Sequence, residues 1–198
     1  MSKKVIITLA VILGILFIGY RMISGTYNTL VSLDEGVKSA WAQVQNQYQR
    51  RMDLIPNLVE VVKGYATHES EVFEKVAEAR SSVGKIQVTA DVLKDPQLFQ
   101  KLQEAQAGLT SALSRLLAVA ENYPQLKANE NFLQLQSQLE GTENRIAVER
   151  QRFNQVVQDY NTKVRLFPTS MLAGMFGFGQ KPYFQADAGA EKAPQVKF

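Results

Sequence analysis

Few residues of this chain could do chemistry, and the single histidine is the first to consider. His68 precedes Glu69 as in the HExxH zinc motif, in which two histidines one helical turn apart bind the metal. The second histidine would stand at position 72, which is Val72, and the chain holds no other histidine and no cysteine. We therefore expect His68 on the surface and predict no metal site.

Other catalytic patterns are also missing from the sequence. It contains no glycine-rich phosphate loop and no G-x-S-x-G turn, and His68 is the only histidine from which a triad could be built. Neighbouring carboxylates such as Glu69 and Glu71 are ordinary on a solvated helix. We nominate no catalytic residue and no cofactor, and predict that the chain is not an enzyme.

The composition is that of one folded domain with an appendage. Of the 198 residues, 45% are hydrophobic and 21% are charged, and 22 basic against 19 acidic residues give a formal net charge of +3. The basic residues are scattered, without the clustered patch or stripe that binds a phosphate backbone. Nucleic acid is therefore not a predicted partner.

An uncharged apolar run near the N-terminus predicts a membrane-spanning helix. Residues 5–20 read VIITLAVILGILFIGY, about 24 Å of helix at 1.5 Å per residue, and the next residues extend it towards the usual span. A cleaved secretory signal begins in the same way, but the following RMISGTYN lacks the small-residue cleavage pattern. We predict a basic segment over residues 1–4 and a retained signal anchor over residues 5–23. Its representative membrane residues are Val5, Leu9, Ile12, Leu16 and Tyr20.

The charges on the two sides of the anchor set its expected direction. Lys3 and Lys4, with the amino terminus, slightly outweigh Arg21 and the more distant Lys38 as positive-inside determinants. We therefore expect the N-terminus in the cytoplasm and the rest of the chain on the other side of the membrane.

Beyond the anchor, apolar residues recur at alternating three- and four-residue steps, a pattern typical of helices that pack like a coiled coil. Pro56 interrupts this seam, so it either kinks a continuous helix or begins a new one near Asp53. We favour a kinked continuous helix because the seam keeps its phase across the proline. The seam residues are Tyr27, Leu30, Val37, Trp41, Val44, Tyr48, Ile55, Leu58, Val62, Tyr65 and Val72.

Two further long helices complete the predicted body. Residues 81–95 lose the periodicity and are expected to connect antiparallel helices, and Asp95 with Pro96 then marks a helix start. That helix should stop near Pro124, and a last helix should run from Asn129 to just before Pro168. Its apolar face is Phe132, Leu135, Leu139, Ile146, Phe153, Val156, Tyr160, Val164 and Phe167. The predicted fold is all-α, an N-terminal transmembrane helix followed by an antiparallel bundle of long amphipathic helices over residues 24–167.

Two charged residues fall on seam positions that are otherwise apolar. Arg51 and Glu149 could form a buried ion pair that fixes helix register at some cost in stability. Charged side chains are usually exposed, so we favour the interpretation that each lies at the edge of the seam.

Residues 168–198 form a tail of different composition, and we do not expect a second core there. Its apolar residues are too few and too broken by glycine to span a bilayer, yet too apolar to lie free in water. They are expected to pack on the bundle, on a neighbouring subunit or on a bilayer surface. These residues are Met171, Leu172, Met175, Phe176 and Phe178.

Several segments resemble the LemA family. They are YNTLVSLDEGVKSAWAQVQNQYQRRMDLIPNLVEVVKGYATHE from residue 27, ENYPQLKANENFLQLQSQLEGTENRI from residue 121, RQRFNQVVQDYNTKVRLFP, and a tail with KPYFQADAGAEKAPQVKF. The resemblance implies a bacterial protein with an N-terminal signal anchor and an antiparallel helical bundle. It implies no reaction, because the role of the family is poorly defined. Some LemA-like proteins are associated with membrane remodelling or with membrane metalloproteases, which implies a scaffold.

The leading functional hypothesis is therefore a scaffold tethered to the bacterial inner membrane, with the bundle on the periplasmic side. Its expected partners are the lipid bilayer, further copies of the chain and a membrane protease or other envelope protein. The alternative is a sensory or ligand-binding bundle, or a protease adaptor, that acts through a partner membrane protein. Candidate interaction or structural residues are Arg51, Asp53, Asn57, Tyr123 and Asn161, with Met175, Phe176 and Phe178 in the tail.

Overall fold

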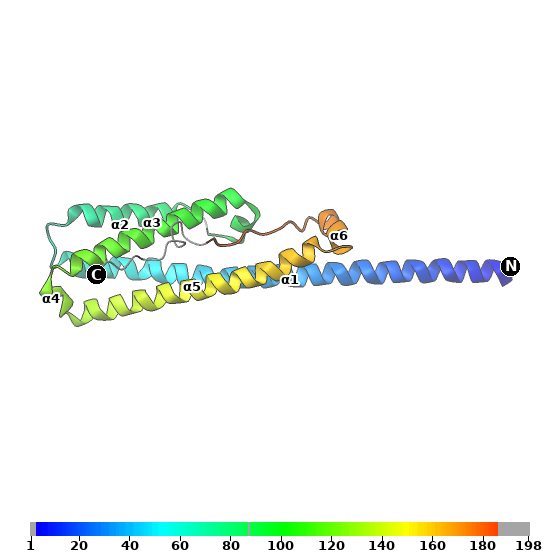
Figure 1. Ribbon diagram of the computed structural model, residues 1–198, viewed down its shortest axis with the longest axis horizontal. Coiled ribbons are helices and arrows are strands. Elements are labelled where there is room, and N and C mark those ends of the chain that lie inside the picture. The colour runs from blue at the N-terminus through cyan, green and yellow to red at the C-terminus, as the bar shows by residue number, and fades with distance from the viewer. Residues whose placement is uncertain (1–2, 87, 186–198) are drawn as a thin grey trace, which may run out of the picture. The chain divides into compact units, whose positions relative to one another are not determined.

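The computed structural model describes residues 3–86 and 88–185, and every regular element within them is a helix. The elements are α1 (Lys3–Lys63), α2 (Ser70–Gly84), the 3-10 helix η1 (Ala90–Lys94), α3 (Pro96–Ala120), α4 (Pro124–Lys127), α5 (Glu130–Arg165) and α6 (Thr169–Phe176) (Figure 1). The all-α prediction is confirmed.

The described chain divides into two compact units, and α1 and α5 contribute to both. Unit 1 contains the described residues up to Ser39 together with Gln155–Lys181. Unit 2 contains Ala40–Asn154 and the described residues from Pro182 onwards.

The core of unit 2 lies among α1, α2, α3 and α5. Ile55, Leu58 and Val62 of the predicted α1 seam are buried there with apolar side chains of the other helices. Helix α2 packs against α3, and the two run side by side (Figure 1). Pro56 lies inside α1, so the prediction of a continuous helix across the proline is confirmed.

The apolar seam was predicted to continue to Tyr65 and Val72, but in the structure it ends at Val62. Helix α1 ends at Lys63, and Val72 belongs to the separate helix α2. Glycine at position 64 is a poor helix former. The turn that follows is fixed by the fully buried Ala66, whose N–H donates to the Val62 carbonyl at 2.9 Å. The body therefore has four main helices instead of three.

The predicted starts of α3 and α5 are confirmed by side-chain caps. The Asp95 carboxylate accepts from the N–H groups of Gln97 and Leu98 at 2.9 and 3.2 Å, and Pro96 opens α3. The Asn129 side-chain oxygen accepts from the N–H of Phe132 at 3.0 Å in the first turn of α5. Each cap satisfies backbone donors that a helix start leaves without a partner.

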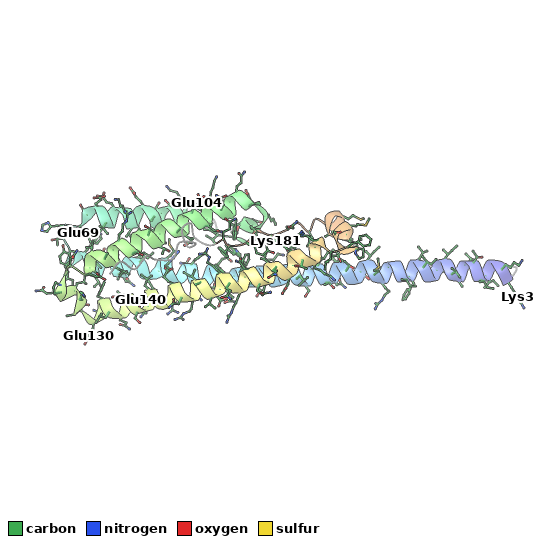
Figure 2. All side chains as sticks on the ribbon, in the orientation of Figure 1. Lys3, Glu69, Glu104, Glu130, Glu140 and Lys181 are labelled. Atoms are coloured by element: carbon green, nitrogen blue, oxygen red, sulfur yellow. The ribbon has the colours of Figure 1, made fainter. Side chains whose placement is uncertain are left out.

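Unit 1 contains the N-terminal part of α1, the last turns of α5, and α6. From Ile6 to Thr29 no residue of α1 is buried. Figure 2 shows the side chains along this part of α1. Leu30 is the first buried residue, so Tyr27, which is 41% exposed, precedes the core. Helix α6 buries Thr169 and Ala173.

The aromatic repeat at the end of α5 is only partly a core repeat. Phe153 and Tyr160 are fully buried in units 2 and 1 respectively, but Phe167 is 79% exposed. The prediction for Phe167 is wrong because α5 ends at Arg165, so Phe167 no longer follows the helical period. Val157, and not the predicted Val156, is the fully buried valine of this stretch.

Candidate interaction sites

The N-terminal part of α1 is long and apolar enough to cross a membrane. Its mean hydropathy over an 18-residue window is 2.3, and none of that window is buried. A signal sequence meets the same criteria. Four of the nominated anchor residues are exposed, namely Leu9, Ile12, Leu16 and Tyr20, whereas the Val5 side chain lies outside the described part of the chain.

Among the described residues of unit 2, Arg51 is the most deeply buried charge, with 1% of the residue exposed. Its guanidinium donates to the Glu143 carboxylate at 2.8 and 3.0 Å, to the Thr110 hydroxyl at 3.0 Å, and to the Gln106 side-chain oxygen. The favoured prediction that Arg51 lies at the seam's edge is therefore wrong. Glu149 is not its partner, because Glu149 pairs with Arg152 on the same helix.

The planar guanidinium explains why an arginine can occupy this position. It presents five donors in fixed directions, so one side chain can bind residues of α3 and α5 at once from α1. Glu143 supplies the opposite charge, and its side chain is 32% exposed, so the carboxylate keeps contact with solvent. The Arg51 Nε has no hydrogen-bond partner among the described residues, so the burial is not fully compensated.

A second feature of unit 2 is an aromatic socket that holds Phe184 of the C-terminal segment. The Phe184 ring lies 4.9, 5.3 and 6.0 Å from the ring centroids of Phe99, Phe153 and Trp41. The Arg150 guanidinium lies over the Phe184 ring, 4.6 Å from its centroid. Only 7% of Phe184 is exposed, so this residue is part of the core.

The backbone around Phe184 is held by one asparagine. The Asn154 side chain donates to the Phe184 carbonyl and accepts from its N–H, both at 2.9 Å. The next residue, Gln185, is also bound. Its N–H donates to the Gln103 side-chain oxygen and its carbonyl accepts from Arg150, both at 3.3 Å. Asn154 therefore pairs with an extended backbone as a neighbouring strand would.

Unit 1 repeats this arrangement at Lys181. The Asn161 side chain donates to the Lys181 carbonyl at 2.9 Å and accepts from its N–H at 2.8 Å. The Tyr160 hydroxyl donates to the Gly179 carbonyl at 3.0 Å. The Lys181 ammonium lies 3.0 Å from the Asp34 carboxylate, and both side chains are largely buried.

The charges around Asp34 shift the protonation of this cluster. Burial raises the pKa of the Asp34 carboxyl, but hydrogen bonds from Lys38 and Lys181 outweigh it, so the pKa is below its ordinary value. Hydrogen bonds to Glu35 and Asp34 raise the pKa of Lys38. Burial, with the nearby Asp34 charge, raises the pKa of Tyr160 to about 12. Asp34 is therefore ionised and the Tyr160 phenol is neutral at neutral pH.

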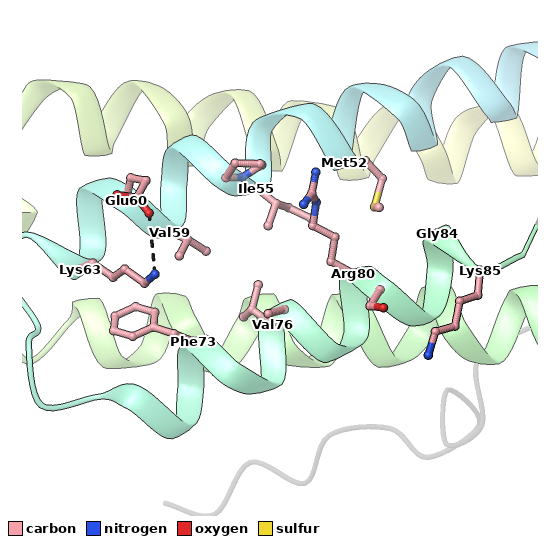
Figure 3. Close-up of a pocket in the computed structure, with 13 residues that line it drawn as sticks. Met52, Ile55, Val59, Glu60, Lys63, Phe73, Val76, Arg80, Gly84 and Lys85 are labelled. Carbon is pink, nitrogen blue, oxygen red and sulfur yellow. Dashed lines mark ion pairs between the residues drawn. The ribbon is translucent and has the colours of Figure 1, made fainter.

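A groove of about 660 Å³ lies between α1 and α2 within unit 2. Figure 3 shows Ile55 and Val59 of α1 facing Val76 of α2 across it. In Figure 3 the Arg80 side chain extends from α2 towards α1, and Lys63 pairs with Glu60 at 3.7 Å. The basic lining residues are Lys63, Arg80 and Lys85.

The other nominated residues lie apart from these sites. Asp53 is exposed and accepts from Gln49 at 2.8 Å, and Asn57 is exposed on α1. Tyr123 is half-buried, and its hydroxyl donates to Glu69 at 3.3 Å. His68 is exposed, as expected.

Sequence reasoning missed the binding of the segment from Gly179 to Gln185. The spacing of Asn154 and Asn161 was a usable signal, because residues seven apart occupy the same face of a helix. Lys181 and Phe184 carried no comparable signal, since a lysine and a phenylalanine in a glycine-rich tail have no periodicity. No group of three or more His, Asp or Glu side chains that could hold a metal occurs among residues 3–86 and 88–185.

Comparison with known proteins agrees with the resemblance seen in the sequence. The model of the LemA family matches residues 40–198. The chain belongs to the LemA family. The match covers all of unit 2 and the C-terminal part of unit 1, including both asparagines that bind the C-terminal segment.

Three LemA-related proteins illustrate how far the similarity extends. Magnetosome protein MamQ 2 of Paramagnetospirillum magneticum strain AMB-1 is 28% identical over 177 residues, which is 80% of this chain and 64% of that protein. MamQ of Magnetospirillum gryphiswaldense is 26% identical over 174 residues, with the same coverage. Protein LemA of Metamycoplasma hominis is 24% identical over 167 residues, covering 84% of this chain and 72% of that protein. This chain thus spans less than two thirds of the length of the MamQ proteins.

Proposed function

We propose that this LemA family chain is a membrane-anchored, non-enzymatic scaffold of the bacterial inner membrane that self-associates or holds another envelope protein. The observation that supports this proposal is the continuity of α1, whose exposed apolar N-terminal part and buried unit 2 seam belong to one helix. One helix therefore carries both the proposed lipid-facing segment and residues of the buried core.

The direction of insertion in this proposal follows the charges beside the anchor. Lys3 and Lys4 keep the N-terminus in the cytoplasm, and the bundle lies on the periplasmic side. The relatives include proteins that are named for the magnetosome, which favours a part in a larger assembly. The alternative of a ligand-binding bundle has the groove between α1 and α2 as its support and stays a prediction.

The anchor is tested with a charge in the middle of the apolar stretch. Ile12→Arg should move the full-length protein out of the carbonate-resistant membrane fraction, because an arginine at the centre of a membrane helix costs about 2.5–3.5 kcal/mol on insertion scales. Leu133→Arg is the matched control, since Leu133 on α5 is 50% exposed and Ile12 is 48% exposed. If both variants stay in the membrane fraction to the same extent as the unchanged chain, the anchor is contradicted.

Assembly is tested by the mass of the full-length protein in native-lipid discs. A defined oligomer, or a stoichiometric second protein, is the expected result. A strictly monomeric chain that also captures no partner after crosslinking in the membrane would contradict the scaffold.

A further inference from the structure

Unit 1 carries an exposed apolar patch where α5 ends and α6 follows. Five large apolar residues there are between 44% and 79% exposed. They are Leu166, Phe167, Met171, Met175 and Phe176. Met171 and Met175 are four residues apart on α6 and so share one face of that helix. A soluble surface rarely leaves so many large apolar side chains together in water, so a cover of matching chemistry is expected.

The patch is fixed directly beside the end of the anchor. The Tyr27 ring contacts Phe176 edge-on at 5.0 Å between centroids and Phe178 at 5.9 Å. Tyr27 follows the end of the proposed span at residue 23 by one helical turn, which is about 6 Å of rise. The headgroup region on each side of a bilayer is about 5–8 Å thick. This contact therefore places the C-terminal end of α6 at headgroup depth.

The cap of α6 maintains this position. Gly177 has a φ of 76°, in the left-handed region that residues with a side chain rarely adopt. The Phe178 N–H then donates to the Ala173 carbonyl at 2.9 Å, which turns the chain back across the end of the helix. Phe178 is thereby brought to Tyr27, and Ala173 is buried while Met175 faces outwards.

The charges near the patch suit an anionic surface. Residues 1–33 and 160–181 contain no aspartate or glutamate, whereas both stretches contain lysine and arginine. Lys163 and Arg165 occupy the last turn of α5, immediately before the patch. Basic residues next to exposed apolar side chains are the combination that binds anionic lipid headgroups together with the acyl boundary.

We propose that α6, with Leu166 and Phe167, is an interfacial membrane segment that lies in the headgroup region of the leaflet from which α1 emerges. Phe167, Met171 and Met175 insert towards the acyl chains, and Lys163 and Arg165 meet the phosphates. The inference rests on the proposed anchor, because the bilayer surface is defined by where α1 leaves it. Of the three predicted positions for the apolar tail residues, on the bundle, on a neighbouring subunit or on a bilayer surface, this proposal selects the bilayer surface.

The test uses spin labels in the full-length chain, which has no cysteine of its own. Met175→Cys and Met171→Cys are labelled separately with a nitroxide and reconstituted in bilayers of phosphatidylcholine and phosphatidylglycerol. Collision with oxygen, which concentrates in lipid, is compared with collision with a water-soluble nickel chelate. Ile12→Cys in the anchor and Leu133→Cys on α5 are the lipid and water references, and all four replaced side chains are exposed.

The expected result is an oxygen-to-nickel collision ratio at positions 171 and 175 that lies between those of the two references. If positions 171 and 175 give the same ratio as Leu133→Cys while Ile12→Cys is protected from the nickel chelate, the inference is overturned and the anchor is left in place. A water-like ratio at Ile12→Cys as well overturns both the inference and the anchor. If labels at positions 171 and 175 collide little with either reagent and show spin–spin broadening between chains, a second copy of the chain covers the patch. This outcome overturns the lipid contact.

Discussion

Arg51 places a full positive charge among the apolar side chains of unit 2, where one guanidinium binds Gln106 and Thr110 of α3 and Glu143 of α5. A buried charge with hydrogen bonds to two other helices allows only one alignment of those helices along their axes. Apolar side chains tolerate small sliding, because dispersion contacts have little directionality. We infer that Arg51 contributes more to the register of the helices than to the free energy of unfolding.

Removing the charge of Glu143 alone should therefore lower the free energy of unfolding more than removing the charges of both Glu143 and Arg51. Glu143→Gln leaves the buried Arg51 without its counter-charge and should lower the free energy of unfolding by roughly 1–3 kcal/mol. The cost stays below that of a fully buried pair because Glu143 is partly exposed. Combining Glu143→Gln with Arg51→Met should recover much of this loss. Urea denaturation of the full-length protein in detergent, followed by circular dichroism, measures both.

The matched control is Glu60→Gln. Glu60 pairs with Lys63 at 3.7 Å, and the two side chains are 76% and 48% exposed, so its loss should change the free energy of unfolding by at most about 1 kcal/mol. The loss in free energy of unfolding is also measured for Arg51→Met alone. If the loss in the double variant equals the sum of the losses in Glu143→Gln and Arg51→Met, the two residues are not coupled and do not fix the helix register together.

The ion pair between Asp34 and Lys181 should make the stability of unit 1 depend on pH. The pKa of Asp34 is lowered in the folded protein, so its contribution is present above the ordinary carboxyl pKa of 3.8 and is lost as the pH falls through the lower folded value. The difference in free energy of unfolding between the unchanged chain and Asp34→Asn should therefore be largest near neutral pH and shrink in acid. Denaturant titrations between about pH 7 and about pH 3 measure it.

Asp91→Asn provides the comparison for this titration. Lys94 also lowers the pKa of Asp91, but this pair is exposed and lies within η1. Its replacement should have a small effect at every pH, because exposed pairs contribute little. A difference for Asp34→Asn that is constant across the pH range would show that the carboxylate charge is not what holds Lys181.

At the scale of elements, α5 serves as a template for an extended segment of the C-terminal tail. Asn154 and Asn161 are seven residues apart, which is about 10.5 Å of helical rise. Lys181 and Phe184 are three residues apart, which is about 10 Å of extended chain. Asn161 pairs with the backbone of Lys181 within unit 1, and Asn154 pairs with the backbone of Phe184 within unit 2. Backbone pairing of this kind fixes the position of the segment without specifying its sequence.

Loss of one asparagine should release the part of the tail that it binds. Asn154→Ala removes two hydrogen bonds to Phe184 and should increase amide hydrogen exchange in peptides that cover residues 182–185. Asn144→Ala, on the exposed side of α5, is the control and should leave this exchange unchanged. If the amides of residues 182–185 exchange at the same rate in both variants, the aromatic socket alone holds the segment.

At the scale of the whole molecule, the charges follow the proposed membrane arrangement. The first 33 residues contain no carboxylate, and the acidic residues begin at Asp34, beyond the proposed bilayer surface. The anchor and α6 both belong to unit 1, so the proposed lipid contacts are confined to that unit. Unit 2 contains the buried Arg51, the aromatic socket and the groove, and under the proposed scaffold role we expect a protein partner to bind its surface.

The amino-acid sequence by itself determined the helical class, the apolar N-terminal stretch, the cap at Asp95, the start of the last helix at Asn129, and most of the buried seam. These features depend on neighbours within one or two helical turns, so periodicity and capping reveal them. The end of α1 before Ala66 was not predicted, because Tyr65 and Val72 happen to continue the apolar period. There, tertiary burial of Ala66 decides the turn.

Only the tertiary structure decided which polar residues are buried and where the tail lies. Arg51 is buried because Gln106, Thr110 and Glu143, which are more than fifty positions away, converge on it. Phe184 is a core residue because Trp41, Phe99 and Phe153 of three helices form its socket. Such contacts join distant parts of the chain, and local pattern carries no information about them until the helices are packed.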